Sequence, residues 1–138
     1  MKRYKHVDLV EAARSALKFA YAPYSNFPVG AAVLTDSGEI VAGCNIENAA
    51  FGPTVCAERV AVFGARARGL RIEAVAIVNG SGTPCYPCGT CRQVLWELAR
   101  GAEIIVEDGK GGVISNKMVD LLPLAFGPED LGIAPQEG

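Results

Sequence analysis

A three-layer α/β/α sandwich around a mixed five-stranded sheet is the fold predicted by this sequence of 138 residues. Short apolar runs alternate with stretches of helical periodicity, which is typical of α/β domains. Two of the runs are direct neighbours, joined by the turn-forming residues Asp36, Ser37 and Gly38. The sheet is therefore expected to begin with an antiparallel hairpin and to continue with largely parallel strands.

The first half of the chain is predicted to contain a helix, the hairpin and a second helix. Apolar residues recur at helical spacing over residues 7–20, and Pro23 ends this helix. The runs at 27–35 and 39–47 are apolar and partly β-branched, as expected of two paired strands. Helical spacing returns over residues 56–68, where we expect the second helix.

The second half continues the alternation. Residues 72–78 are almost wholly apolar, as a strand covered on both faces must be. A helical pattern follows over 88–101, and a short apolar strand over 102–107. The glycine-rich segment 109–112 is short enough to be a turn, and a short helix is expected near 118–122.

Composition predicts one domain and limits its partners. The chain is half apolar, is long enough to bury a core, and has no internal repeat or linker, so residues 1–138 should form a single domain. Lys and Arg are scattered and the formal net charge is -2, which argues against a nucleic-acid partner. The sequence shows no secretory signal and no apolar run of roughly 20 residues, so we expect a soluble, cytoplasmic protein that binds no membrane.

Cysteine spacing points to a metal site. The absence of a secretory signal and the odd number of cysteines favour reduced thiols over disulfides; the five are Cys44, Cys56, Cys85, Cys88 and Cys91. Cys88 and Cys91 are three positions apart at the start of a predicted helix and can hold one tetrahedral ion. Pro87 places Cys85 in the preceding loop, outside that turn.

A lone Cys-x-x-Cys also fits a redox pair or a structural zinc site. The redox interpretation is weaker here because Cys56, at the start of another predicted helix, is followed by Glu58. Three thiolates leave the fourth coordination position of zinc for water, and Glu58 would be the base beside it. Arg59 can donate hydrogen bonds to the thiolates and offset their negative charge.

The frame Cys56-x-Glu58…Pro87-Cys88-x-x-Cys91 is the Cys₃ form of the zinc-deaminase signature. From about Ala20 to Leu131 the sequence resembles the small homotetrameric cytidine deaminases, in the segments AYAPYSNFPVGAAV, GCNIENAAFGPTVCAERVA, PCGTCRQV and LLPLAFGPEDL. The resemblance implies a cytidine deaminase-like fold, a homotetramer and one zinc ion per subunit. It also implies hydrolysis of cytidine and 2′-deoxycytidine to the uridines and ammonia, in pyrimidine salvage.

The resemblance assigns a role to each matching residue. Cys56, Cys88 and Cys91 would bind zinc, and Glu58 would shuttle protons as the catalytic residue. Arg59 would hydrogen-bond the thiolates from outside the coordination sphere. The residues implied in substrate binding are Phe27 beside the pyrimidine ring, Asn45 and Glu47 at the ribose 3′-hydroxyl, Ala57, and Phe126, which similar proteins contribute to a neighbouring subunit's pocket.

Two positions depart from the family pattern, and two other functions compete. Phe51 stands where many relatives have tyrosine, and Tyr86 replaces the usual serine. The site would also suit another cytosine-containing nucleoside, such as a blasticidin S-like antibiotic, but Asn45 and Glu47 favour cytidine. A non-catalytic, zinc-stabilised interaction domain is the alternative from a different class, and Glu58 argues against it.

Overall fold

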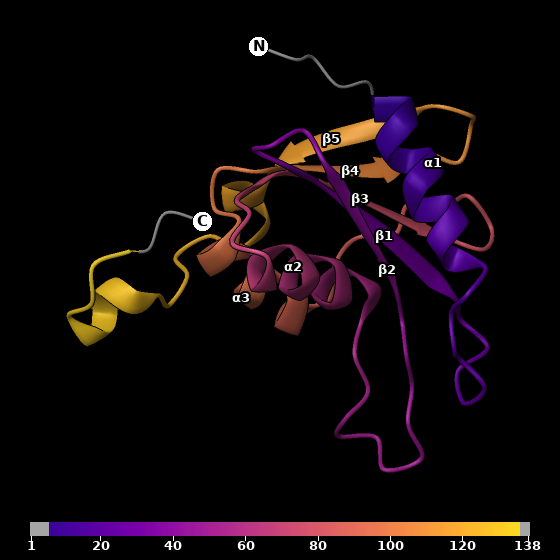
Figure 1. The fold of residues 1–138 in the computed structure, drawn as a ribbon, viewed down its shortest axis with the longest axis horizontal. Coiled ribbons are helices and arrows are strands. Elements are labelled where there is room, and N and C mark those ends of the chain that lie inside the picture. The colour runs from indigo at the N-terminus through magenta and orange to yellow at the C-terminus, as the bar shows by residue number, and fades with distance from the viewer. Residues whose placement is uncertain (1–5, 136–138) are drawn as a thin grey trace.

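The structure is a computed structural model that describes residues 6–135. Helix α1 covers one face of a five-stranded sheet, and α2 and α3 cover the other, which confirms the three-layer sandwich (Figure 1). The elements follow in the order α1 (His6–Leu17), β1 (Val29–Thr35), β2 (Ile40–Cys44), α2 (Ala57–Ala67), β3 (Ile72–Asn79), α3 (Gly89–Leu98), β4 (Glu103–Glu107) and β5 (Val113–Lys117), with 3₁₀ turns η1 (Met118–Leu121) and η2 (Pro128–Leu131).

The strand order is β2-β1-β3-β4-β5. The predicted hairpin is present, since β1 and β2 pair antiparallel and Gly38 in their turn has a φ of 86°. The expectation of largely parallel strands is wrong. Among the described strands only β3 and β4 are parallel, because β1 pairs antiparallel with β3 and β5 folds back antiparallel on β4.

Strand β5 was the one that the sequence pattern could not locate. Its residues are mostly exposed, so they lack the apolar alternation that marks a half-buried strand. The predicted turn at 109–112 makes the β4–β5 hairpin, in which the Asp108 N–H donates to the Gly112 carbonyl at 3.0 Å and the Asp108 carboxylate accepts from the N–H groups of Lys110 and Gly112. Side-chain and backbone hydrogen bonds therefore define this edge strand.

Two hydrophobic layers hold the helices on the sheet. Successive residues of β1 point to opposite faces, so Ala31 and Val33 pack toward α2 and α3 while Ala32 and Leu34 pack toward α1. All seven residues of β1 are buried, as expected for a central strand covered on both sides. Burial of this apolar surface is the main force that fixes the helices.

Glycines at two positions let the helices approach the sheet closely. A Cβ at Gly30 would lie 2.0 Å from the carbonyl oxygen of Ala13 in α1. A Cβ at Gly43 would lie 2.7 Å from the backbone nitrogen of Ala61 in α2. The absence of a side chain at Gly43 therefore lets α2, whose N-cap is Cys56, pack closely against β2. Among residues 6–135, no helix is both long and apolar enough to cross a membrane.

Candidate active site

Three cysteine sulfurs meet where α2 and α3 begin. Cys56 and Cys88 are the N-cap residues of these helices, both with extended backbones, and Cys91 lies in the first turn of α3. The three Sγ atoms all lie within 4.8 Å of one another, and those of Cys56 and Cys88 are 3.8 Å apart. Zinc–sulfur bonds of about 2.3 Å in a tetrahedron separate two sulfurs by about 3.8 Å, so this donor set fits one zinc ion.

The surroundings of the three sulfurs favour a thiolate at Cys56. A hydrogen bond with Cys91, helped by Arg59 and Cys88, lowers the pKa of Cys56 to about 5. The shared proton and burial raise the pKa of Cys91. Two helix N-termini meet here, and each contributes roughly half a positive charge. The pocket therefore stabilises a thiolate at Cys56 within a set of three soft sulfur donors, the kind that zinc prefers.

Arg59 lies beside the sulfurs, as expected. Its Nη2 donates to the Sγ of Cys56 at 3.6 Å, and the thiolate contacts raise the pKa of the guanidinium. The Nε atom of Arg59 is buried and has no hydrogen-bond partner within the described part of the chain. A permanent positive charge thus lies next to the cluster, where it offsets the charge of the thiolates.

Glu58 is the carboxyl group that belongs to the same site. It lies in the first turn of α2 and is only 4% exposed. Burial, with a smaller contribution from the nearby Cys56 thiolate, raises the pKa of its carboxyl to about 7. A carboxyl with a pKa near neutrality can both accept and release a proton, which is the property required of a general acid and base.

One cavity of about 290 Å³ joins Glu58 to most of the residues expected to bind substrate. Phe27, which is 52% exposed, and Tyr86, which is 40% exposed, both lie on its wall. The residues that line the cavity are Ser25, Phe27, Val29, Asn45, Glu47, Thr54, Val55, Cys56, Ala57, Glu58, Cys85, Tyr86 and Cys88. The cavity is therefore lined by segments that lie far apart in the sequence.

Phe126 does not line this cavity. Its side chain is 58% exposed, and its backbone carbonyl accepts a hydrogen bond of 2.8 Å from Nε2 of Gln93 in α3. Phe51, which stands where many relatives have tyrosine, also lies outside the cavity lining. It has a φ of 50°, and its exposed ring packs edge-on against Tyr24, with ring centroids 6.2 Å apart. Neither residue lines the cavity beside the sulfurs.

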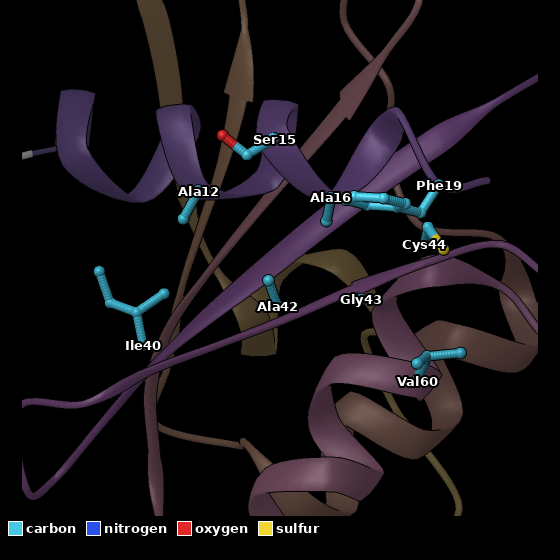
Figure 2. A pocket seen from close by; sticks show the side chains of 9 residues that line it. All are labelled: Ala12, Ser15, Ala16, Phe19, Ile40, Ala42, Gly43, Cys44 and Val60. Carbon is cyan, nitrogen blue, oxygen red and sulfur yellow. The ribbon is translucent and has the colours of Figure 1, made fainter.

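A larger hollow of about 660 Å³ lies between α1, β2 and α2 (Figure 2). Its walls carry one hydroxyl and one thiol but no charged side chain, and they consist of Ala12, Ser15, Ala16, Phe19, Ile40, Ala42, Gly43, Cys44 and Val60. Convergent polar groups, more than size, mark a reaction site. The smaller cavity beside the sulfurs is therefore the candidate active site.

Asn45 has a role that sequence reasoning missed. Its Oδ1 accepts from the Val29 N–H at 2.9 Å, and its Nδ2 donates to the Phe27 carbonyl at 2.9 Å. Asn45 is buried, and it fastens the segment that carries Phe27 to the end of β2. No local sequence signal indicates such a pairing across the hairpin.

We predict that Asn45→Ala destabilises the fold as well as the pocket. The variant leaves the buried N–H of Val29 without an acceptor, which should cost about 1–3 kcal/mol of unfolding free energy. Urea denaturation of the zinc-loaded protein measures this change. Asn48→Ala is the matched control. Among residues 6–135 the hydrogen bond made by its side chain is the one that Oδ1 accepts from the exposed Ala50 N–H, so its effect should stay within about 0.5 kcal/mol. Equal stability of the Asn45 variant and wild type would contradict the prediction.

Three metal ligands that leave a fourth coordination position for water, beside a buried acid, are typical of a catalytic metal centre. The family described as the cytidine and deoxycytidylate deaminase zinc-binding region matches residues 3–107 of the chain. The cytidine deaminase of Sporosarcina psychrophila is 44% identical over 131 residues, which cover 94% of this chain and 96% of that protein. That of Mycobacterium tuberculosis H37Rv is 46% identical over 120 residues, which cover 86% and 87%.

A solved structure agrees with these sequences. The crystal structure of cytidine deaminase from Burkholderia pseudomallei matches with a TM-score of 0.83 at 46% identity, over 89% of this chain and 100% of that one. The chain belongs to the cytidine and deoxycytidylate deaminase family, and it is an enzyme of the hydrolytic deaminase type.

Proposed function

We propose that this enzyme uses zinc to hydrolyse cytidine and 2′-deoxycytidine to uridine and 2′-deoxyuridine, with release of ammonia, in pyrimidine salvage. The observation that carries the proposal is the placement of the buried Glu58 carboxyl in one cavity with Cys56 and Cys88 and with the polar side chains of Asn45 and Glu47. Chemistry and nucleoside recognition can therefore take place in the same enclosed space.

Cys56, Cys88 and Cys91 would hold one zinc ion per chain, and their spacing supports this proposal. A zinc ion bound there supplies a Lewis acid that makes water a better nucleophile near neutral pH. The hydrogen bond from Cys91, and after it the 3.6 Å hydrogen bond from Arg59, would favour the Cys56 sulfur as a thiolate. Because the ligands come from two helix N-termini, small movements of either helix would open the site.

Glu58 is the proposed catalytic residue. Its carboxyl would take a proton from water, pass it to N3 of the cytosine ring, and later protonate the amine that leaves C4. The overall change is a C4–N bond replaced by a C4–O bond, with water consumed and ammonia released. A carboxyl with a pKa raised by burial to about 7 suits both directions of this proton movement.

The remaining wall residues would orient the nucleoside. The aromatic ring of Phe27 would lie beside the pyrimidine, and the Glu47 carboxylate would accept a hydrogen bond from the ribose 3′-hydroxyl. Asn45 would contribute there and hold Phe27 in place through its two backbone contacts. Ala57, fully buried in the first turn of α2, would form the wall beside Glu58.

The proposed assembly is a homotetramer in which Phe126 completes a neighbouring pocket. Phe126 is exposed and does not line the cavity of its own chain, which supports this role. The segment that carries η2, drawn in yellow, projects away from the sheet (Figure 1). A sedimentation mass of a single chain would contradict the assembly. We place the enzyme, a single domain, in the cytoplasm, where small nucleosides and no nucleic acid or membrane would be its partners.

An assay of the zinc-loaded protein tests the function. Ammonia release is measured with cytidine, 2′-deoxycytidine, free cytosine and blasticidin S. We expect turnover of both nucleosides and little of free cytosine, because cytosine lacks the sugar that Glu47 would bind. Faster turnover of the antibiotic would favour the alternative substrate, and failure on all four compounds would refute an enzymatic role on cytosine derivatives.

A further inference from the structure

Ser25 makes two hydrogen bonds with Glu47, which no sequence pattern indicates. Its hydroxyl donates to Oε2 of Glu47, and its backbone N–H donates to Oε1 at 3.1 Å. The backbone N–H of Tyr24 adds a second bond to Oε1 at 3.0 Å. The same Ser25 hydroxyl accepts the Phe27 N–H at 3.0 Å. One serine thus joins the carboxylate and the aromatic residue of the cavity wall.

These bonds leave one defined position for a ligand. Each carboxylate oxygen has about two acceptor sites, and two backbone N–H groups fill those of Oε1. The Ser25 hydroxyl occupies one acceptor site of Oε2, so the second acceptor site of Oε2 is left for a donor from the ligand. Without this bond the carboxylate would be held through Oε1 alone, and Oε2 would lose its defined orientation on average.

We propose that Ser25 is a positioning residue for the nucleoside, because it fixes the Glu47 oxygen that receives the sugar hydroxyl. This inference rests on the proposed function, in which Glu47 binds the ribose 3′-hydroxyl. Ser25 also keeps the pKa of the Glu47 carboxyl below its ordinary value through its hydroxyl and N–H, which maintains the carboxylate as an acceptor. Ser25 acts on binding, and the proton transfers at Glu58 do not involve it.

The test compares Ser25→Ala with wild type on cytidine and on 3′-deoxycytidine. With cytidine, KM should rise about ten-fold while kcat stays within about two-fold, because only an interaction common to the ground and transition states is lost. With 3′-deoxycytidine the rise in KM should be clearly smaller, because the hydroxyl that Glu47 receives is missing and only the hydrogen bond from the Phe27 N–H is lost. A serine that merely supported the fold would impair both substrates equally.

Two further variants complete the design. Ser25→Thr keeps the hydroxyl and should restore most of the affinity for cytidine. Ser37→Ala removes an equally exposed serine from the β1–β2 turn and should change neither substrate. Zinc content and circular dichroism show whether Ser25→Ala is folded, and the Ser25→Thr comparison stands even where the alanine variant is not.

The outcomes separate this inference from the proposed function. An unchanged KM of Ser25→Ala for cytidine, or an equal loss on both nucleosides, overturns the role of Ser25 while leaving the deaminase function intact. A failure of Ser25→Thr to restore affinity also overturns it. If the wild-type enzyme deaminates neither nucleoside, the proposed function fails and the role of Ser25 falls with it.

Discussion

Glu58→Gln should retain its zinc and lose nearly all turnover. The glutamine has the same shape and cannot carry the proton between water, the ring nitrogen and the departing amine. General acid and base assistance is worth about 10² to 10⁴ in rate, so kcat should fall by at least that factor. The drop exceeds that expected for any residue that only binds the nucleoside. Steady-state ammonia release and metal analysis of the same preparation measure the two properties together.

Glu73→Gln is the matched control for this variant. Glu73 is an exposed residue of β3 and does not line the cavity. Its replacement should leave kcat within about two-fold, as is usual for surface substitutions away from a site. An active, zinc-loaded Glu58 variant would show that another group moves the protons. Loss of zinc in that variant would show that Glu58 acts on the metal site instead.

The second large effect separates the cysteines. Cys88→Ala and Cys91→Ala should each lose both zinc and activity, because two remaining thiolates hold the ion poorly. The loss of metal affinity should exceed the roughly 10- to 100-fold that outer hydrogen-bond partners contribute. Metal content after dialysis, compared with ammonia release, measures this loss.

Cys85→Ser is the control, and it should keep zinc and activity. Cys85 lies outside the group of three sulfurs and packs against the core, where burial raises the pKa of its thiol to about 11. Its sulfur is not one of the three that lie within 4.8 Å of one another, so we expect it not to bind the ion. Loss of zinc in this variant would move Cys85 into the coordination sphere and contradict the three-cysteine site.

The layers of the fold were predictable because their signals are local. Residues of the hairpin and of the helices over 56–68 and 88–101 carry apolar periodicity, turn residues and helix starts within a few positions. Strand β5 was missed because its polar, exposed residues satisfy hydrogen bonds at an edge without burying apolar surface. The antiparallel pairing of β1 with β3 joins strands that are distant in sequence, and apolar periodicity does not indicate which strands become neighbours.

The meeting of Cys88 with Cys91 could be predicted from spacing, whereas the hydrogen bonds around the three sulfurs could not. Cys88 and Cys91 share a helical turn, and the family frame adds Cys56 from 32 residues away. The contacts of Asn45 with Phe27 and Val29, and of Glu47 with Ser25, depend on how two loops are arranged in space. Their residues are common in turns, so composition alone gives no sign of them.

The location of Cys56 and Cys88 at two helix starts has a consequence for folding. An ion that joins them closes a loop of 32 residues containing all of α2 and β3. By the entropy argument used for disulfide cross-links, closing such a loop lowers the entropy of the unfolded chain and raises its free energy by about 3 to 4 kcal/mol. The proposed zinc site would therefore also stabilise the fold. Unfolding experiments on any variant compare like with like only at equal metal occupancy, and a change in Tm can report a lost ion as readily as a lost contact.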